Sequence, residues 1–506
     1  MKSISNRFNI MINMVILSFL MVASTAVNAI GNQLNQPKLT PCYMEGLADR
    51  MMCGSITQPL SDDTNDGYID IHFAVIPAIK SSTPDEAILG FAGGPGQGAI
   101  GLARVFDHNL RFARETRDIV LIDQRGTGFS HQLQCESDDL KTQFAFNDVI
   151  ADLQAIGAND IHKCKAKLNI DLSHFTTPVA AKDFESVRKS LGYKGFHLYG
   201  VSYGTRVAQE YQRQFPESVL TSTLDGVVPL QQSLAAIGEA VDGSLTVLFE
   251  RCEADDLCKA QYPNLESKFN ALLTQLEKRP VQTQVRHPRT HELITFTVTK
   301  MKFYSAIRFS LYSHSQRAIV PMVIEKALSG DFSPLAGMMA NVDLTQSLAM
   351  GMHNAIVCGE DWPRLTRQAR AQYNKTDIGR AMIAGLDIAC PILDVKAVDE
   401  TFYLPLKTST PTLLLSGGRD PATPASWAEL AMVQMSNATH LIAPTATHGI
   451  GSQTCAPKII AKFIEQQSMQ GIDTNCIDEP NDKPFFMNIN GVAIAKSQST
   501  EAANKE

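Results

Sequence analysis

The chain has 506 residues, of which 44% are hydrophobic and 19% are charged, a balance typical of folded globular proteins. Lys and Arg total 45 against 52 Asp and Glu, giving a formal net charge of −7, so the chain lacks the cationic surplus with which nucleic-acid-binding proteins neutralise phosphates. A mean hydropathy near −0.08 excludes a polytopic membrane protein, and the length allows about three domains.

The N-terminus has the features of a signal peptide. Lys2 and Arg7 precede an apolar stretch at 10–22, and residues 27–29 have the small-x-small pattern of a cleavage site. The apolar stretch is shorter than the roughly 20 residues of a membrane-spanning helix. We therefore predict that residues 1–29 are a signal peptide, that the protein is exported to the periplasm or secreted, and that no stable membrane insertion remains after cleavage. An uncleaved N-terminal anchor is the alternative.

The ten cysteines fall into five couples of near neighbours, separated by 6 to 32 positions. Cysteines pair in an oxidising compartment, and about 945 complete pairings are arithmetically open to ten of them. The order along the chain favours pairing within each couple. The predicted disulfides join Cys42 with Cys53, Cys135 with Cys164, Cys252 with Cys258, Cys358 with Cys390, and Cys455 with Cys476. The sequence has no CxxC motif and predicts no metal site.

Short apolar runs in the first part of the chain end in glycine-rich loops. These runs are 87–91 before the loop 93–96, 118–122 before the loop 123–128, and 196–199 before Gly200. An alternating segment at 68–79 predicts a further strand. Buried runs followed by glycine-rich loops and helical patterns are typical of parallel strands in an α/β sheet.

From about residue 231 the pattern becomes mainly helical. Apolar side chains at positions 265, 269, 272, 273 and 276 form one face of an amphipathic helix that ends before Pro280. The other predicted elements are a helical region at 301–340, an isolated strand at 293–298, strands at 412–416 and 440–442, and a closing helix at 457–467.

Residues 200–204 read Gly-Val-Ser-Tyr-Gly. They match the Gly-x-Ser-x-Gly nucleophile elbow, in which a strand turns sharply into a helix and exposes the serine. An apolar run precedes the motif and a helix-compatible segment follows it, as the elbow requires. We predict that Ser202 is the catalytic nucleophile; a serine in an ordinary glycine-flanked turn is the alternative.

A serine nucleophile needs a general base, and the base needs an orienting carboxylate. In chains with this elbow, the acid and then the histidine follow the serine. Asp420 follows the predicted strand at 412–416, and His448 lies in a glycine-flanked loop after the last strand. His440 is the competitor, but it opens the last strand. The order predicts Asp420 and His448 as the catalytic acid and base.

The glycine-rich loop 93–96, Gly-Gly-Pro-Gly, follows an early strand. Such a loop can aim backbone N–H groups at a developing oxyanion, together with the N–H group after the nucleophile. We predict Tyr203 and Gly94, or a neighbour of Gly94, as the oxyanion donors; a loop without a catalytic part is the alternative. The lysine of a phosphate-binding loop is absent, and the proposed chemistry needs no metal or organic cofactor.

Five motifs together resemble one family. They are Gly-Gly-Pro-Gly at 93–96, Asp-Gln-Arg-Gly-Thr-Gly at 123–128, Gly-Val-Ser-Tyr-Gly-Thr at 200–205, Leu-Asp-Gly-Val-Val at 224–228, and Gly-Gly-Arg-Asp-Pro-Ala-Thr-Pro at 417–424. The set resembles the secreted α/β-hydrolase peptidases that include prolyl aminopeptidase and, more closely, tripeptidyl aminopeptidase. The cysteine couples and residues 484–486 resemble the tripeptidyl branch. Ala92 and Phe129 depart from the usual pattern, which leaves the substrate preference open.

The resemblance implies an α/β-hydrolase fold: a mostly parallel sheet flanked by helices, with an inserted, mainly helical cap. The expected boundaries are 1–29 for the signal peptide, 36–230 for the first part of the core, 231–400 for the cap, 401–480 for the second part of the core, and 481–506 for a C-terminal tail. One core split by a cap then replaces the separate domains that the length allows.

The resemblance also implies that acidic cap residues bind the free α-ammonium group of the substrate. The candidate is Glu360, in the Cys-Gly-Glu-Asp sequence 358–361, because a carboxylate can form a charge-assisted hydrogen bond with an ammonium group. An ordinary salt-bridged acidic pair beside a disulfide is the alternative. The expected function is an exported serine aminopeptidase, tripeptidyl or prolyl aminopeptidase-like, that acts on peptides with a free N-terminus. A carboxylesterase with the same triad and a non-catalytic binding protein with a hydrolase fold are the alternatives.

Overall fold

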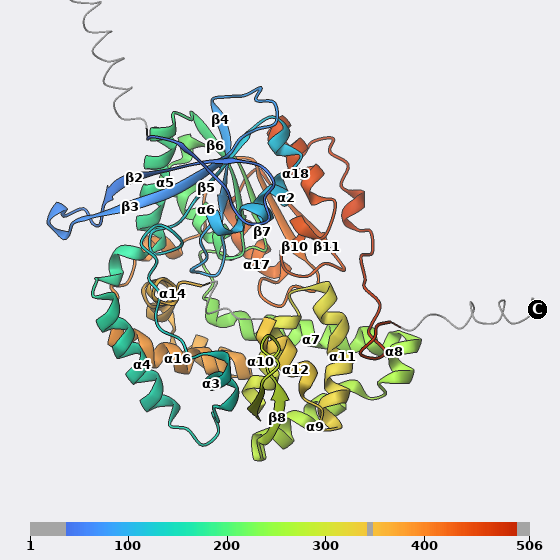
Figure 1. The fold of residues 1–506 in the computed structure, drawn as a ribbon. Coiled ribbons are helices and arrows are strands. Elements are labelled where there is room, and N and C mark those ends of the chain that lie inside the picture. The colour runs from blue at the N-terminus through green and yellow to red at the C-terminus, as the bar shows by residue number, and fades with distance from the viewer. Residues whose placement is uncertain (1–36, 342–347, 493–506) are drawn as a thin grey trace, which may run out of the picture.

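The computed structural model describes residues 37–341 and 348–492 (Figure 1). The predicted signal peptide, residues 1–29, lies outside these ranges. The strands are β1 (Thr40–Cys42), β2 (Met51–Pro59), β3 (Tyr68–Ile76), β4 (Glu86–Phe91), β5 (Asp118–Ile122), β6 (Gly195–Val201), β7 (Val219–Asp225), β8 (Val281–Arg286), β9 (Leu293–Val298), β10 (Thr412–Gly417) and β11 (Ala438–Ala443).

The helices alternate with the strands in the first and last parts of the chain and dominate its middle. They are α2 (Ala103–Leu110), α3 (Leu140–Ala145), α4 (Leu153–Leu168), α5 (Thr177–Leu191), α6 (Tyr203–Gln214), α7 (Ile237–Ala254), α8 (Asp256–Gln261), α9 (Leu265–Lys278), α10 (Lys300–Ser310), α11 (His314–Leu328), α12 (Ser333–Asn341), α14 (Met350–Ile356), α15 (Arg367–Tyr373), α16 (Asp377–Leu393), α17 (Ala425–Ala431) and α18 (Ala456–Gln466). Within the two described ranges, no helix combines the length and the apolar character needed to cross a membrane.

The main sheet has nine strands in the described part of the chain, in the order β1-β2-β3-β5-β4-β6-β7-β10-β11. The pairs from β5 to β11 are parallel, whereas β1, β2 and β3 form an antiparallel edge that joins β5. Because parallel strands point the same way, the carboxyl ends of β5, β4, β6, β7, β10 and β11 meet at one edge of the sheet. The predicted strands at 87–91, 118–122, 196–199 and 412–416 are confirmed.

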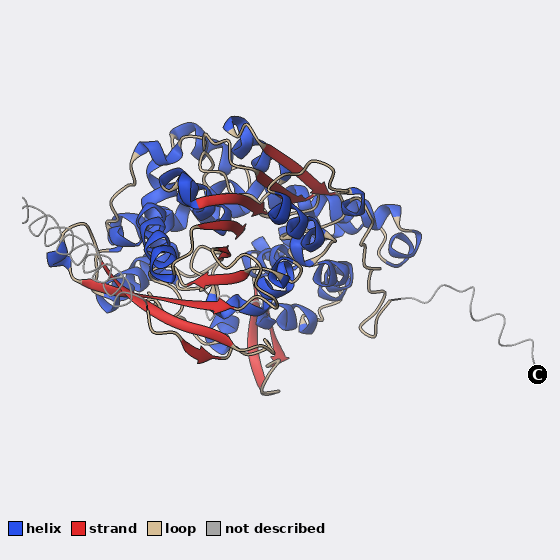
Figure 2. Cartoon of the chain, turned by 90° about the horizontal axis from the view of Figure 1, so that it is seen from above, coloured by secondary structure: helices blue, strands red, loops and turns tan. Residues whose placement is uncertain are grey.

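Helices cover both faces of this sheet (Figure 2). Alternate side chains of a strand point to opposite faces, and β4 separates them clearly. Phe91 packs with Phe184 of α5, with ring centroids 5.2 Å apart, on the face that α5 and α6 cover. Ile88 points to the other face and joins the core beneath α2 and α18. The expected α/β-hydrolase fold, a mostly parallel sheet flanked by helices, is confirmed.

The cap has a hydrophobic core of its own, to which α7, α9, α10 and α11 contribute most of the side chains. The amphipathic face of α9 is buried there, including Phe269 and Leu276. The segment predicted as an isolated strand is not isolated, because β9 pairs with β8 in an antiparallel hairpin. The polar, mostly exposed side chains of β8 gave no apolar pattern from which that strand could be predicted.

An earlier segment also belongs to the cap. Figure 1 shows α3 and α4 beside the cap helices, where α3 contacts β9 and α4 contacts α16. Phe144 of α3 is completely buried in the cap core. Assigning all of residues 36–230 to the hydrolase core was therefore wrong for α3 and α4. The reason is that α4 buries little more than Cys164, so its sequence lacks the apolar stripe that marks a packed helix.

The C-terminal tail is attached to the cap over its described part. Phe485 is completely buried in the cap core, and the guanidinium of Arg251 lies 4.3 Å from the centre of its ring. The backbone N–H of Phe486 donates a hydrogen bond to the carbonyl of Ala318 in α11. Residues 481–492 thus pack on the folded protein.

All ten cysteines are paired, each with its neighbour along the chain. The disulfides are Cys42–Cys53, Cys135–Cys164, Cys252–Cys258, Cys358–Cys390 and Cys455–Cys476. The fourth joins the π-helix Val357–Asp361 to α16, and the second ties the loop before α3 to α4. Three of the disulfides therefore reinforce the cap. In the core, Cys42–Cys53 joins the paired strands β1 and β2, and Cys455–Cys476 joins the start of α18 to the segment that follows this helix.

A buried ion pair holds the loop that follows β5. Arg125 and Asp183 have side chains only 2% exposed. The guanidinium donates to both carboxylate oxygens, at 2.7 and 2.8 Å, and to the carbonyls of Leu60 and His174, both at 2.8 Å. Arg125 thus joins the loop after β5 to α5 and to Leu60, the residue that follows β2.

Replacing Arg125 with Met should lower the free energy of unfolding by about 3–5 kcal/mol, because it leaves the Asp183 carboxylate buried without its cation. Urea unfolding followed by circular dichroism measures the change. Lys182→Met is the matched control, since Lys182 and Asp62 are 55% and 93% exposed and such a pair contributes only about 0–1 kcal/mol. Equal losses in the two variants would contradict the assigned role of Arg125.

Candidate active site

Ser202 stands at the turn between β6 and α6. Its backbone has φ 57° and ψ −128°, a conformation that residues other than glycine rarely adopt. Its N–H donates to the carbonyl of Asp225 at 2.9 Å, and its carbonyl accepts from the hydroxyl of Thr205 at 2.6 Å. These bonds hold the turn from both sides, and the serine side chain stays partly exposed at the carboxyl edge of the sheet.

The glycines of the motif are required by close packing. A Cβ atom at Gly204 would lie 2.2 Å from the carbonyl oxygen of Phe91, and one at Gly200 would lie 2.5 Å from the carbonyl oxygen of Gly204. Neither distance is compatible with a side chain. The first turn of α6 can therefore pack against β4 at Gly204 and against β6 at Gly200 only because both positions are glycine, which is what a nucleophile elbow requires.

His448 and Asp420 form a hydrogen-bonded pair. Nδ1 of His448 donates to Oδ2 of Asp420 at 2.8 Å. Both carboxylate oxygens of Asp420 accept further hydrogen bonds. The donors are the N–H groups of Ala422 and Thr423, at 2.8 and 2.9 Å, and the Thr423 hydroxyl, at 2.7 Å. Burial disfavours the imidazolium, but the Asp420 carboxylate outweighs burial and raises the pKa of His448 above its ordinary value.

The fold brings this pair to the end of the sheet where Ser202 lies. Asp420 follows β10, His448 follows β11, and both strands run parallel to β6. A Cβ atom at Gly449 would touch Val201, the residue before the serine, at 3.8 Å. The competing histidine, His440, lies within β11 instead, with Nε2 2.9 Å from the Ser416 hydroxyl.

The glycine-rich loop after β4 packs directly on the nucleophile. A Cβ atom at Gly93 would lie 3.0 Å from the Cβ of Ser202. Gly94 has φ +110°, and a Cβ there would lie 2.8 Å from the nitrogen of Gly96. The loop thus lies against the serine at Gly93, the neighbour of Gly94, and Tyr203 follows the serine in the first turn of α6, where backbone N–H groups have no partner within the helix. The oxyanion roles of Gly94 and Tyr203 stay a prediction.

Two buried aspartates fix the loops of this site. From the sequence, they were known only as members of two motifs, with no role assigned. Asp123, after β5, accepts the N–H groups of Ile100 and Phe129 at 2.9 and 2.8 Å. It thereby ties the segment that follows the glycine-rich loop to the end of β5. The carboxylate is completely buried, and burial raises the pKa of Asp123.

Asp225, after β7, holds the histidine loop in the same way. Its carboxylate accepts the N–H groups of Ile450 and Gly451 at 2.8 and 2.9 Å and the Tyr199 hydroxyl at 3.0 Å. The negative charge of Asp225 adds to that of Asp420 in raising the pKa of His448. Asp225 is therefore a positioning residue that acts through the histidine loop.

The cap reaches the histidine through Tyr312, between α10 and α11. The Tyr312 and His448 rings meet edge to face, with centroids 5.2 Å apart, and the hydroxyl of Thr447 donates to the Tyr312 carbonyl at 2.8 Å. Nothing in the sequence around Tyr312 indicates this contact, because it joins segments that are far apart along the chain. The cap therefore borders the site on the side of the base.

Glu360 lies in a buried network rather than at a free surface. Its carboxylate accepts the N–H of Thr177 at 2.7 Å and lies 3.4 Å from the guanidinium of Arg206. Asp361 pairs with Arg206 at 3.3 Å and with Arg364 at 2.8 Å. Burial raises the pKa of Glu360 to about 7, although Arg206 opposes the shift. These contacts favour the alternative reading of Glu360, a salt-bridged acidic pair, over an amine-binding group, because both oxygens already have partners.

The assembled groups suit acyl transfer: a serine at an elbow, an imidazole oriented by a carboxylate, and backbone N–H groups beside the serine. Among the described residues, no three His, Cys, Asp or Glu side chains are grouped so that they could hold a metal ion.

Comparison with protein families places the chain among known folds. A model described as "alpha/beta hydrolase fold" matches residues 87–255, and one described as "TAP-like protein" matches residues 373–476. The chain has the α/β-hydrolase fold. The first match contains Ser202, and the second contains Asp420 and His448, so the matched regions carry all three residues in the predicted order.

Three curated proteins are similar to parts of this chain. The putative hydrolase YuaR of Escherichia coli is 29% identical over 37% of this chain and 38% of its own. The serine protease Hip1 of Mycobacterium tuberculosis is 28% identical over 39% and 40%, and the tripeptidyl aminopeptidase of Streptomyces lividans is 29% identical over 35% of each chain. Each alignment thus spans less than half of either protein.

Asp225→Asn should slow the labelling of Ser202 by a fluorophosphonate about 10- to 100-fold, because an amide cannot accept all three hydrogen bonds and the histidine loop shifts. Removal of the charge should also lower the pKa of His448. Labelling needs the neutral imidazole, so the acid limb of its pH profile should move to lower pH.

The control is Asp85→Asn, at the opposite end of the sheet, where the carboxylate is 56% exposed and pairs with Lys194. This variant should keep the wild-type rate and pH profile. A fall in labelling by Asp225→Asn without any displacement of the acid limb would leave Asp225 with a structural role alone and would refute its electrostatic effect on His448.

Proposed function

We propose that this hydrolase is an exported serine peptidase that removes short peptides or single residues from the free N-termini of peptides. Ser202 is the nucleophile, His448 the general base and acid, and Asp420 the carboxylate that orients the imidazole. The observation that carries the proposal is the His448–Asp420 hydrogen bond of 2.8 Å, at the edge of the sheet where the elbow presents Ser202.

The reaction proceeds in two steps. His448 takes the proton of the Ser202 hydroxyl as the oxygen attacks the substrate carbonyl, and the N–H groups of Tyr203 and Gly94 stabilise the oxyanion. His448 then protonates the leaving amine, which departs and leaves an acyl-enzyme. Water, activated by the same imidazole, releases the acyl group. The bond from Nδ1 to Asp420 leaves Nε2 as the nitrogen that exchanges protons with the serine and the leaving group.

The raised pKa of His448 suits this task, since a base that titrates near the working pH both accepts and returns a proton efficiently. The contacts of Asp420 support this role as well. Burial raises the pKa of Asp420, but the charge of the His448 imidazolium, together with hydrogen bonds from the imidazole, two backbone N–H groups and a hydroxyl, lowers it below the ordinary value. Asp420 thus remains ionised while His448 cycles.

Two relatives support a peptide substrate over an ester, because their names state a serine protease and a tripeptidyl aminopeptidase. The cap supports a restricted site, since Tyr312 of the cap meets His448 edge to face, and a capped site favours the end of a peptide over the middle of a long polypeptide. The five disulfides support export, since such bonds persist in oxidising compartments.

Ser202→Ala should lower kcat for a tripeptidyl anilide by several orders of magnitude, because no other residue can form the acyl-enzyme. Its thermal unfolding midpoint should stay at or above that of the wild type, since alanine keeps the elbow and removes no buried bond. Release of the anilide chromophore measures the rate. Ser267→Ala, an exposed change on α9, is the matched control and should keep full activity.

The preference for a free N-terminus has its own measurement. N-acetylation of the same tripeptidyl anilide should abolish or strongly reduce hydrolysis, because the acetyl group removes the positive charge and adds bulk at the chain end. Equal rates for blocked and free substrates would rule out an aminopeptidase. Hydrolysis of nitrophenyl esters with no peptide cleavage would identify a carboxylesterase instead.

A further inference from the structure

The C-terminal segment (481–486) runs from the core to the cap, which it reaches near α8 and α11 (Figure 1). Its Phe485 side chain is completely buried in the cap core. The backbone of Phe486 is bonded on both sides: its N–H donates to the carbonyl of Ala318 in α11 at 3.0 Å, and its carbonyl accepts the Tyr262 hydroxyl at 2.7 Å. One end of this segment is therefore anchored in the cap.

The other end of the C-terminal segment is bonded to the histidine loop, residues 444–453, which carries His448. The side-chain amide of Asn481 donates to the backbone carbonyl of Gln453 at 2.6 Å. The backbone N–H of Asn481 donates to the hydroxyl of Thr445 at 3.1 Å. Asn481 thus holds this loop near both of its ends.

Gln453 holds the backbone on either side of the base. Its Oε1 accepts the N–H of Thr447 at 3.0 Å, and its Nε2 donates to the carbonyls of His448 and Gly449 at 2.8 and 3.1 Å. Bonds to three consecutive residues fix the path of the backbone there, and with it the direction of the imidazole. Asn481 therefore acts on the base through one intervening residue.

Asp482, the next residue of the segment, pairs with the residue that precedes the proposed catalytic acid. The guanidinium of Arg419 donates to both oxygens of Asp482, with Nη2 3.3 Å from Oδ2. The same carboxylate lies 3.1 Å from Nε of Arg251 in α7 of the cap. Burial raises the pKa of Asp482, but the hydrogen bond from Arg419 and the charges of both arginines lower it below its ordinary value. An ion pair with two contact points fixes orientation as well as distance.

The backbone at Arg419 is held as well, in the acid loop (417–424). Its N–H donates to the carbonyl of Ala446 at 3.0 Å, so the acid loop and the histidine loop are bonded to each other. Its carbonyl accepts the hydroxyl of Ser244 in α7 at 2.8 Å. The residue before Asp420 is therefore fixed by the histidine loop, by the cap and by the C-terminal segment.

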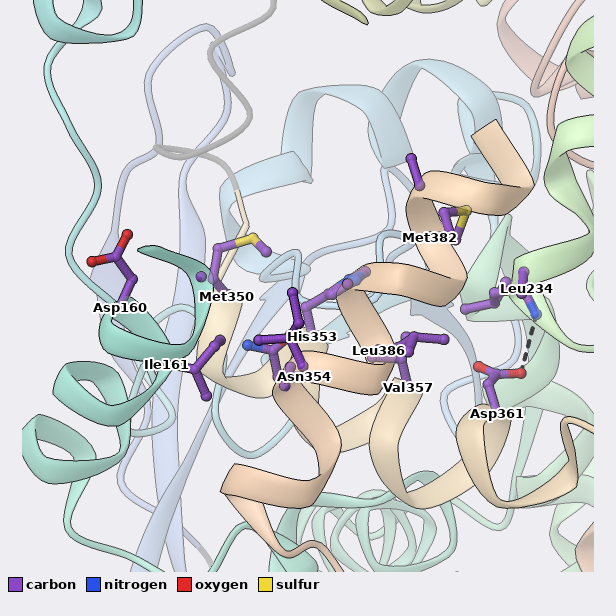
Figure 3. A pocket seen from close by; sticks show the side chains of 16 residues that line it. Asp160, Ile161, Leu234, Met350, His353, Asn354, Val357, Asp361, Met382 and Leu386 are labelled. Carbon is purple, nitrogen blue, oxygen red and sulfur yellow. Dashed lines mark hydrogen bonds between the residues drawn. The ribbon is translucent and has the colours of Figure 1, made fainter. Parts of the chain in front are cut away.

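Different contacts join the cap to the core on the side of the nucleophile. Asp361, which accepts the N–H of Leu234 at one end of a cap cavity (Figure 3), lies 3.3 Å from Arg206 of α6. Nδ1 of His353 donates to the carbonyl of Pro95 at 3.2 Å. These contacts fix the cap relative to the elbow and the glycine-rich loop, whereas the C-terminal segment joins the cap to the loops of the acid and the base.

We propose that the C-terminal segment is a strap that holds His448 and Asp420 in their catalytic positions against the cap. Asn481 and Asp482 are its positioning residues, and each acts through one residue of the loop that it contacts rather than on the substrate. The inference deepens the proposed function and rests on the triad assigned there. Loss of a strap contact then slows catalysis in the folded protein, whereas a tail that only adds stability would leave the rate of the folded protein unchanged.

Asn481→Ala and Asp482→Ala test the proposal, because each removes one link and keeps the anchor in the cap. Each should lower kcat for a tripeptidyl anilide and the rate of fluorophosphonate labelling of Ser202 about tenfold, since small displacements of the acid or base slow the chemical step. KM should stay within about twofold of the wild-type value. Asp482→Glu should restore most of the loss, because its longer carboxylate still reaches both arginines. Glu479→Ala removes an exposed acidic residue of the preceding chain, outside these contacts, and as the matched control should keep the wild-type rates.

Amide hydrogen exchange measures the hold on the histidine loop without any turnover. Peptides that cover residues 444–453 should exchange at least about fivefold faster in Asn481→Ala than in the wild type or in Glu479→Ala, because the loop loses a bond to the strap. The strands β10 and β11 should keep their protection in all three proteins, which shows that the sheet is intact.

Wild-type labelling and turnover in both alanine variants would overturn the inference, even if their unfolding midpoints fall, because the segment would then only add stability. An Asp482→Glu variant as slow as Asp482→Ala would overturn the positioning role of that carboxylate. If Asp482→Ala does not fold, Asn481→Ala, which leaves the ion pairs intact, decides the question. A wild type that is labelled but cleaves no peptide would refute the proposed function, while labelling and exchange still test the strap. A wild type that is not labelled would overturn the triad and the strap together.

Discussion

The turn at Ser202 imposes a positive φ on a residue with a side chain, a strain of about 1–3 kcal/mol that persists only where the surroundings fix the backbone. Here β6 lies between β4 and β7 in the sheet, and the Ser202 N–H donates a hydrogen bond to the carbonyl of Asp225 at the end of β7. Gly204 lets α6 start within contact of β4. Because the parallel strands end at the same edge, fixing this turn also fixes where Asp420, His448 and the glycine-rich loop lie relative to Ser202.

Three buried aspartates at that edge share one physical task. Asp123, Asp225 and Asp420 lie at or just after the ends of β5, β7 and β10, and each accepts two backbone N–H groups from segments at that edge. A loop at the end of a sheet has few backbone partners of its own, so carboxylates supply them. In the described part of the chain, Asp420 is the only one of these three aspartates that also forms a hydrogen bond with His448. The carboxylates thus set the shape of the site, and one of them additionally orients the base.

Much of the core could be predicted because its signals are local. An apolar run before a glycine-rich loop specifies a buried strand, and chain order separates His448 from His440. The cap was harder to predict: α4 has almost no apolar face, β8 is polar on most of its length, and Tyr312 meets His448 only through tertiary packing. The surroundings of Glu360 include Arg206, which lies in α6, far away along the chain. No sequence pattern in either segment predicts that the two side chains are in contact.

The Arg206 network explains how a separate cap can serve chemistry in the core. Arg206 belongs to α6, the helix that begins beside the nucleophile, whereas Glu360 and Asp361 belong to the π-helix that continues α14. α14 in turn is bonded to the glycine-rich loop at Pro95. The cap is therefore joined to the core on both sides of Ser202, so that α14, the glycine-rich loop and the elbow keep one relative position.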